Sequence, residues 1–258
     1  MLFRDADQKQ ENQIDALREF IAKKVDAIAL SPLVETGWDA VLSEAKAAGI
    51  PVIFSDRTAR LQDESLATTF LGGDFAEEGR RAARWLAEKE GTVSDLAIVE
   101  LRGTEDSTPA IDRAQGFREV LSLHAGYRIL DSADGDFTRE GGKRVMKTFL
   151  RRWGTGIKVV YAHNDDMALG AIEAIEEAGL RPGIDIVLVS IDGERAAFQA
   201  MVSGKLNCSV ECSPLLGPQL MKAVKDYASG KDLPVRIISE EGVYPQETAS
   251  RSLSSRRY

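Results

Sequence analysis

The chain has 258 residues, of which 43% are hydrophobic, and a formal net charge of -8 with a sequence pI near 5.0. This length is enough to bury a substantial core and suits two domains of ordinary size. The acidic balance argues against nucleic acid as the main partner. No apolar run reaches the roughly 20 residues of a membrane span, and the first residues do not resemble a signal peptide.

Strand-like and helix-like segments alternate along almost the whole chain. The first helix is indicated by Ile14, Leu17 and Ile21, which recur at helical spacing. Helices are predicted near 10–23, 38–49, 75–89, 110–123, 139–152, 165–178, 194–203 and 214–229, and strands near 27–30, 51–56, 67–71, 95–101, 127–132, 157–162, 185–191, 206–211 and 235–239. Strands that alternate with helices of this length indicate an α/β fold with a parallel sheet and right-handed crossovers.

The number of strands favours two sheets rather than one. Strongly twisted open sheets rarely exceed about ten strands without splitting. We therefore predict two domains that the chain connects through short segments near 71–74, 211–214 and 241–244. The predicted domains are residues 1–72 with 213–241 and residues 73–212 with 242–258.

Three apolar runs are each followed by a cluster of small polar or charged residues. They are Val52–Phe54 before Asp56 and Arg57, Val159–Tyr161 before Asn164–Asp166, and Val187–Val189 before Asp192 and Gly193. Buried parallel strands have such β-branched runs, and ligands of open α/β sheets bind beyond the carboxyl ends of the strands. The pattern therefore predicts a ligand-binding crevice.

The individual residues leave alternatives open. Asp56 and Arg57 offer acceptors beside a planar donor group, but Asp is also a common helix cap. One of the polar residues at 164–166 should cap a helix, which does not account for all three. Arg113, early in a helix, is disfavoured by the helix dipole, so it is either positioned for a ligand or solvated. Phe137 either stacks on a sugar ring or packs on its own helix.

Other residues favour structural interpretations. His163 and His124 are interpreted as satisfied loop residues, Trp38 as a core residue, and Cys208 and Cys212 as unpaired core thiols. The sequence has no phosphate-binding glycine loop, nucleophile elbow or zinc-ligand spacing. We therefore predict a binding protein without cofactor or metal rather than an enzyme.

Eight segments in order resemble the sugar-binding proteins of bacterial ABC importers, which have a type I periplasmic-binding fold. They are Asp5–Gln13, Val25–Ile28, Ile50–Val52, Asp56-Arg57, Asp112–Phe117, Gly135–Phe137, Ala162–Met167 and Ile191–Gly193. Glu35–Trp38 and Tyr161–Met167 are most similar to the galactofuranose-binding branch of this family. The resemblance covers nearly the whole chain.

The resemblance implies two Rossmann-like lobes, joined by three hinge strands, that close on one monosaccharide. On this sequence the ligand-binding residues would be Asp56, Arg57, Arg113, Phe137, Asn164, Asp192 and Glu211. In ribose binders a Ser-Asp-Asn motif supplies a hinge asparagine, whereas Gly73-Asp74-Phe75 stands here, so that contact is lost or different. The resemblance further implies a periplasmic monomer that delivers its sugar to an ABC permease.

The first residues differ from the family pattern. Family members begin with a signal peptide and a further strand and helix, roughly 30 or more residues that do not precede Met1. We expect the first lobe to be incomplete, and a truncated chain of this kind to be unstable in that lobe and weak in sugar binding, because the neighbours of the missing strand would have unpaired backbone groups.

Two other functions remain open at this stage. The same fold serves as the effector-sensing domain of LacI-type transcription regulators, which need an upstream DNA-binding segment. A sugar-acting enzyme of doubly wound fold is the third possibility, and turnover of a bound sugar would distinguish it.

Overall fold

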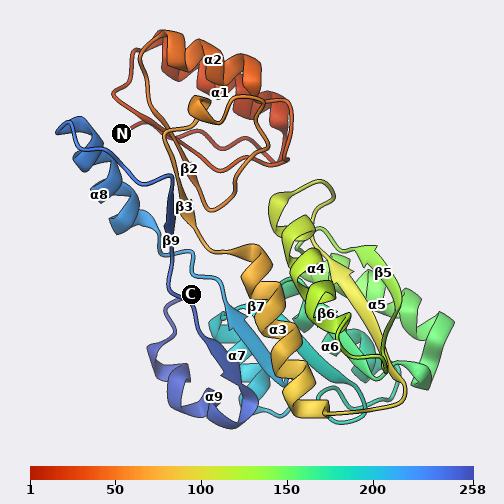
Figure 1. The fold of residues 1–258 in the computed structure, drawn as a ribbon. Coiled ribbons are helices and arrows are strands. Elements are labelled where there is room, and N and C mark those ends of the chain that lie inside the picture. The colour runs from red at the N-terminus through yellow and green to blue at the C-terminus, as the bar shows by residue number, and fades with distance from the viewer. The chain divides into compact units, whose positions relative to one another are not determined.

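The computed structural model describes all 258 residues, and these divide into two compact units. Unit 1 contains Met1–Gly73, Asp106–Thr108 and Pro214–Glu240, and unit 2 contains Asp74–Glu105, Pro109–Ser213 and Glu241–Tyr258. Each unit has its own sheet (Figure 1), which is parallel in unit 1 and parallel except for one strand in unit 2. The alternating strands and helices predicted from the sequence are therefore confirmed.

Unit 1 is a four-stranded parallel sheet in the order β1-β2-β3-β9. Its elements are α1 (Gln10–Ala22), β1 (Ile28–Leu30), α2 (Asp39–Ala47), β2 (Val52–Ser55), the 3-10 turn η1 (Glu64–Leu66), β3 (Thr69–Gly72), α8 (Gly217–Ala228) and β9 (Arg236–Ile238). Residues 1–6 belong to no strand or helix.

Trp38 anchors the core of unit 1. Its side chain is fully buried, and its indole Nε1 donates a hydrogen bond to the Val34 carbonyl at 2.8 Å. Leu17 from α1, Leu42 from α2 and Phe54 from β2 belong to the same apolar cluster. Trp38 is therefore a core residue, as predicted, and its polar atom is satisfied within the fold.

Unit 2 has a six-stranded sheet in the order β10-β8-β7-β6-β4-β5. Its elements are α3 (Phe75–Glu90), β4 (Leu96–Arg102), α4 (Thr108–Leu121), β5 (Tyr127–Asp134), α5 (Arg139–Trp153), η2 (Gly154–Gly156), β6 (Val159–Ala162), α6 (Asp165–Glu177), β7 (Val187–Asp192), α7 (Arg195–Val202), β8 (Cys208–Glu211), β10 (Val243–Pro245), α9 (Gln246–Ser252) and η3 (Leu253–Ser255). The first residue of α4, Thr108, is grouped with unit 1.

One strand of unit 2 departs from the predicted parallel arrangement. β10 pairs antiparallel with β8, with Tyr244 opposite Ser209. A three-residue strand that ends in Pro245 has too little periodicity to be recognised from the sequence. The other strands of this sheet are parallel, so the carboxyl ends of β4, β5, β6 and β7 meet along one edge.

None of the helices combines the length and the apolar composition that a membrane crossing needs.

Candidate ligand-binding site

Four predicted ligand residues of unit 2 lie together at the carboxyl edge of its sheet. Arg113 comes from α4, Phe137 from the loop between β5 and α5, Asn164 from the end of β6, and Asp192 from the end of β7. Direct contacts link each of them to Arg113 or to Phe137. The structure therefore brings these four residues into one cluster, which we call the arginine cluster.

Arg113 is the centre of the arginine cluster and is only 3% exposed. Its Nε donates to Glu78 Oε2 at 2.7 Å and its Nη1 to the His163 carbonyl at 2.6 Å, while its Nη2 lies 3.6 Å from Asp192 Oδ1. Burial alone would lower the pKa of Arg113, but the Glu78 carboxylate holds it well above its usual range. Arg113 is therefore a fixed cation, and the interpretation as a solvated side chain is wrong.

Two aromatic rings flank the guanidinium of Arg113. Its Cζ lies 5.1 Å from the ring centre of Phe75 and 5.9 Å from that of Phe137. Phe75 is buried at the start of α3, directly after Asp74, whose carboxylate caps that helix by accepting from Glu77 N at 3.0 Å. Phe75 therefore packs beside Arg113, at the position where the resemblance implied that a hinge contact is lost or different.

Phe137 has an unusual backbone that turns its ring toward Gly103. Its φ is 57°, a left-handed conformation that is costly for a bulky residue. A Cβ atom at Gly103 would lie 1.9 Å from Cζ of the Phe137 ring, so only glycine fits there. The ring also packs partly against the apolar core of unit 2, so the structural interpretation of Phe137 holds for part of its surface.

Asn164 is the N-cap of α6. Its Oδ1 accepts from Met167 N at 3.0 Å, and its Nδ2 donates to the Phe137 carbonyl at 3.2 Å. The amide therefore caps the helix with its oxygen and holds the strained Phe137 loop with its nitrogen. One of the three polar residues after β6 does cap a helix, as predicted.

Asp192 ends β7 with a φ of 133°, and the turn that follows is held by a buried carboxylate. Asp165 Oδ2 accepts from Gly193 N and from Glu194 N, each at 2.8 Å. Asp165 Oδ1 accepts from the hydroxyls of Ser190 and Ser209. Burial raises the pKa of Asp165 to about 6, and these donors oppose that rise.

The candidate residues of unit 1 lie after β2. Asp56 has a φ of 69°, and its N–H donates to the Leu71 carbonyl of β3 at 2.8 Å. Arg57 Nε lies 3.8 Å from Asp56 Oδ2. Residues 57–63 form no helix, so the interpretation of Asp56 as a helix cap is wrong.

Glu211 is the one predicted residue of unit 2 whose carboxylate points away from the arginine cluster. Its Oε1 accepts from Arg256 Nη1 at 2.7 Å and from the Tyr258 hydroxyl at 3.2 Å, and its Oε2 accepts from Gly242 N and the Tyr244 hydroxyl, both at 3.1 Å. Glu211 therefore fastens the C-terminal segment to β8. The next residue, Cys212, interacts electrostatically with Arg113 and Asp192 instead.

His163 is a fully buried residue beneath the arginine cluster. Its Nε2 lies 3.1 Å from Glu100 Oε1, and its Nδ1 accepts from Gly103 N at 3.4 Å. Burial lowers the pKa of His163, which favours the neutral ring with the proton on Nε2. His163 is thus a satisfied structural residue, as predicted.

Only one group of three side chains has potential metal ligands close together. The carboxylates of Glu78 and Glu241 and Sγ of Cys212 lie within 4.8 Å of one another. However, Glu78 Oε2 already accepts from Arg113, and burial raises the pKa of the Cys212 thiol well above its usual range. A metal needs the thiolate, so the chemistry of this group does not suit one.

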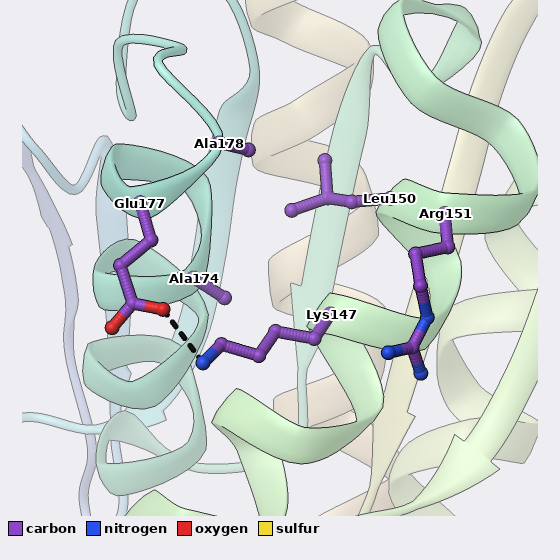
Figure 2. A pocket seen from close by; sticks show the side chains of 6 residues that line it. All are labelled: Lys147, Leu150, Arg151, Ala174, Glu177 and Ala178. Carbon is purple, nitrogen blue, oxygen red and sulfur yellow. Dashed lines mark ion pairs between the residues drawn. The ribbon is translucent and has the colours of Figure 1, made fainter.

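A surface pocket of about 310 Å³ lies between α5 and α6, away from these residues (Figure 2). Its lining consists of Lys147, Leu150, Arg151, Ala174, Glu177 and Ala178. Lys147 and Glu177 form an ion pair of 2.6 Å across it. No predicted ligand residue contributes to this pocket, so we do not assign the ligand site to it.

The arrangement of strands, helices and strand-end polar residues has a match among known families. A periplasmic binding protein domain matches residues 2–232. The chain belongs to the periplasmic binding protein family. Galactofuranose-binding protein YtfQ of Escherichia coli (strain K12) is 43% identical over 256 residues, which are 98% of this chain and 80% of YtfQ.

Solved structures of this family have the same fold. A protein from Mycobacterium smegmatis in complex with β-D-fucofuranose has a TM-score of 0.96 and is 49% identical, with 100% of this chain and 84% of that chain covered. The binding protein of the arabinose ABC transporter from Shewanella sp. ANA-3, bound to α- and β-L-arabinofuranose, has a TM-score of 0.95 and is 47% identical, with 99% and 84% covered. The predicted type I periplasmic-binding fold is therefore confirmed.

Three residues important to this periplasmic binding protein site were not selected from the sequence. Glu78 and Asp165 are buried carboxylates that hold Arg113 and the turn after Asp192, respectively. Cys212 interacts electrostatically with Arg113 and Asp192. Strand alternation could have indicated Cys212, because successive side chains point to opposite faces. With Glu211 directed to the C-terminal segment, the next side chain is directed the other way.

Proposed function

We propose that this protein is the solute-binding component of a carbohydrate ABC importer and that it binds one monosaccharide in its furanose form. The observation that carries the proposal is the arginine cluster, in which a buried cation, a strand-end carboxylate and an aromatic ring converge. The relatives support the ring form, because one is named for galactofuranose and two were solved with fucofuranose and arabinofuranose.

The roles of the side chains follow from their donor and acceptor groups. Arg113 donates to sugar oxygens and Asp192 accepts from hydroxyls, while Asn164 donates from the N–H that does not bond to Phe137. The ring of Phe137 covers the apolar face of the sugar. Asp56 and Arg57 of unit 1 bind further hydroxyls. We do not propose Glu211 as a ligand residue, because four groups already donate to its carboxylate.

The proposal extends to partners and compartment. The sugar-bound protein acts as a monomer in the periplasm and delivers its ligand to the permease subunits of the importer. It binds no nucleic acid, and it releases the sugar unchanged, because the site offers hydrogen-bonding groups without an activated nucleophile.

Calorimetry and NMR with L-arabinose, D-galactose and D-fucose test this function. We expect reversible binding of at least one of them, with the labelled anomeric carbon of the bound sugar at a furanose rather than a pyranose chemical shift. Asp192→Ala should abolish the heat of binding. Binding of pyranose forms alone would contradict the ring-form assignment, and conversion of the sugar to a product would contradict the transport function.

Phe137→Ala should weaken sugar binding by about 10- to 100-fold, because burial of a phenylalanine side chain contributes roughly 1.5–3 kcal/mol. The alanine retains a Cβ atom, so the left-handed backbone at this position is no easier to adopt than in the parent. Titration calorimetry with the sugar that binds the parent protein measures the change.

Phe149→Leu is the matched control for the loss of sugar affinity in Phe137→Ala. Phe149 is a buried residue of α5 in the same apolar cluster, and its replacement should lower stability but leave sugar affinity unchanged. Equal affinities of Phe137→Ala and the parent protein would show that the ring is only structural.

A further inference from the structure

Two neighbouring buried carboxylate oxygens of unit 2 have no hydrogen-bond partner among the other groups of the protein. They are Oε1 of Glu78, a fully buried residue of α3, and Oε1 of Glu241, the first residue of unit 2 after the chain leaves unit 1. Their carboxylates lie within 4.8 Å of each other. Since an orphaned buried acceptor is costly, two of them side by side call for a shared donor.

The charges around the pair point to a proton as that donor. On α3, Glu78 and Arg81 face Glu241, and Arg81 Nη1 donates to the Glu241 carbonyl at 2.7 Å. Arg113 of α4, Asp192 at the end of β7 and Cys212 after β8 complete the surroundings. The carboxyl groups of Glu78, Glu241 and Asp192 thus face two guanidinium groups and a neutral thiol, and one of these guanidinium groups, Arg81, also pairs with Glu77 at 3.3 Å. At least one added proton is therefore needed to balance the charge.

We propose that Glu241 is a protonated carboxylic acid at neutral pH that donates a hydrogen bond to Glu78 and thereby positions Arg113 for sugar binding. Burial and the nearby Glu78 carboxylate raise the pKa of Glu241 to about 9. The positioning role rests on the proposed function of the arginine cluster, whereas the protonation state does not.

The hydrogen bonds of Glu78 link the protonation of Glu241 to the sugar site. Glu78 uses Oε2 for Arg113 Nε and has Oε1 left for Glu241. With both oxygens bonded, the plane of the Glu78 carboxylate is fixed, and so is the guanidinium that it holds. Loss of the proton leaves a negative charge on Glu241, beside Glu78. The hydrogen bond to Glu78 is then lost, and Arg113 is drawn toward the two carboxylates and away from the sugar.

Infrared difference spectroscopy tests the proton directly. At pH 7 the parent protein should show a protonated carboxyl band that shifts in D2O and that is absent from Glu241→Gln. Glu119→Gln removes a partly exposed carboxylate of α4 that pairs with Arg80, and it should leave the band unchanged. A parent spectrum identical to that of Glu241→Gln would overturn the proposal, whether or not the protein binds sugar.

The pH dependence of sugar affinity tests the positioning role. Affinity of the parent should fall at least 10-fold as the pH rises from 8 through about 9. Glu241→Gln, which keeps a donor, should bind as the parent does at pH 7 and lose this decline, while Glu241→Ala should bind about 10-fold more weakly. Equal affinities and equal pH profiles for all three would overturn the positioning role.

Discussion

Arg113→Ala should abolish measurable sugar binding and lower the free energy of unfolding of unit 2 by about 3 to 5 kcal/mol. The substitution removes a charged donor from the proposed site and leaves Glu78, which is fully buried, without its counter-ion. Urea unfolding in a Trp38→Phe background measures the stability, because the remaining tryptophans, Trp85 and Trp153, both belong to unit 2.

A double substitution separates the two effects of Arg113. In Arg113→Met with Glu78→Gln the fully buried side chain at position 78 no longer carries a charge without a counter-ion, so most of the stability should return. Sugar affinity should stay lost, because neither new side chain donates as a guanidinium does. Recovery of binding in this variant would contradict the role of Arg113 as a ligand residue.

Arg80→Ala is the surface control. Arg80 lies on α3 and pairs with Glu77 and Glu119, but about a third of its side chain is exposed. Such exposed pairs contribute about 0–1 kcal/mol. If Arg80→Ala lowered the free energy of unfolding as much as Arg113→Ala does, burial of the ion pair would not be the reason why Arg113 stabilises unit 2.

Much of the fold and of the arginine cluster could be predicted because both depend on local patterns. The β-branched runs before Asn164 and Asp192 mark strands that end at one edge of a parallel sheet, and that edge brings distant residues together. A cation in the first turns of a helix has an electrostatic cost, which left Arg113 either positioned or solvated, and the family resemblance selected it as a ligand residue.

The partners themselves could not be predicted, because they depend on contacts between distant segments. Glu78 lies in a helix rich in charged residues. Nothing near it in the sequence indicates that it pairs with Arg113, which is 35 positions away. Glu211 was assigned to the ligand by the family resemblance. The groups that bind its carboxylate, Arg256 and Tyr258, come from the last residues of the chain, far from β8 in the sequence.

Asp165→Ala should lower the free energy of unfolding of unit 2 by about 3 to 5 kcal/mol and weaken sugar binding as well. The carboxylate satisfies the N–H groups of Gly193 and Glu194 and two serine hydroxyls, all in or beside the turn that follows Asp192. Each buried donor left without an acceptor costs about 1–3 kcal/mol. The turn should therefore relax, and with it the strained backbone that aims Asp192.

Asp165→Asn should be tolerated, because its geometry matches that of the protonated acid. Its oxygen can accept from the two N–H groups, and its NH2 can donate to the hydroxyl oxygens of Ser190 and Ser209. The asparagine variant therefore isolates the effect of the charge at this position from the effect of the hydrogen bonds.

The stability difference between Asp165→Asn and the parent protein should depend on pH. The pKa of Asp165 is about 6 in the folded state, against an ordinary value of 3.8. Between these values the folded parent holds a proton that the unfolded chain has released, so its stability falls as the pH rises. The asparagine variant has no such loss, and it should gain up to about 3 kcal/mol on the parent between pH 4 and pH 7. Urea unfolding of both proteins across this range measures the difference; a difference that is constant, or that changes in favour of the parent as the pH rises, would show that hydrogen bonds stabilise the Asp165 carboxylate more than burial destabilises it.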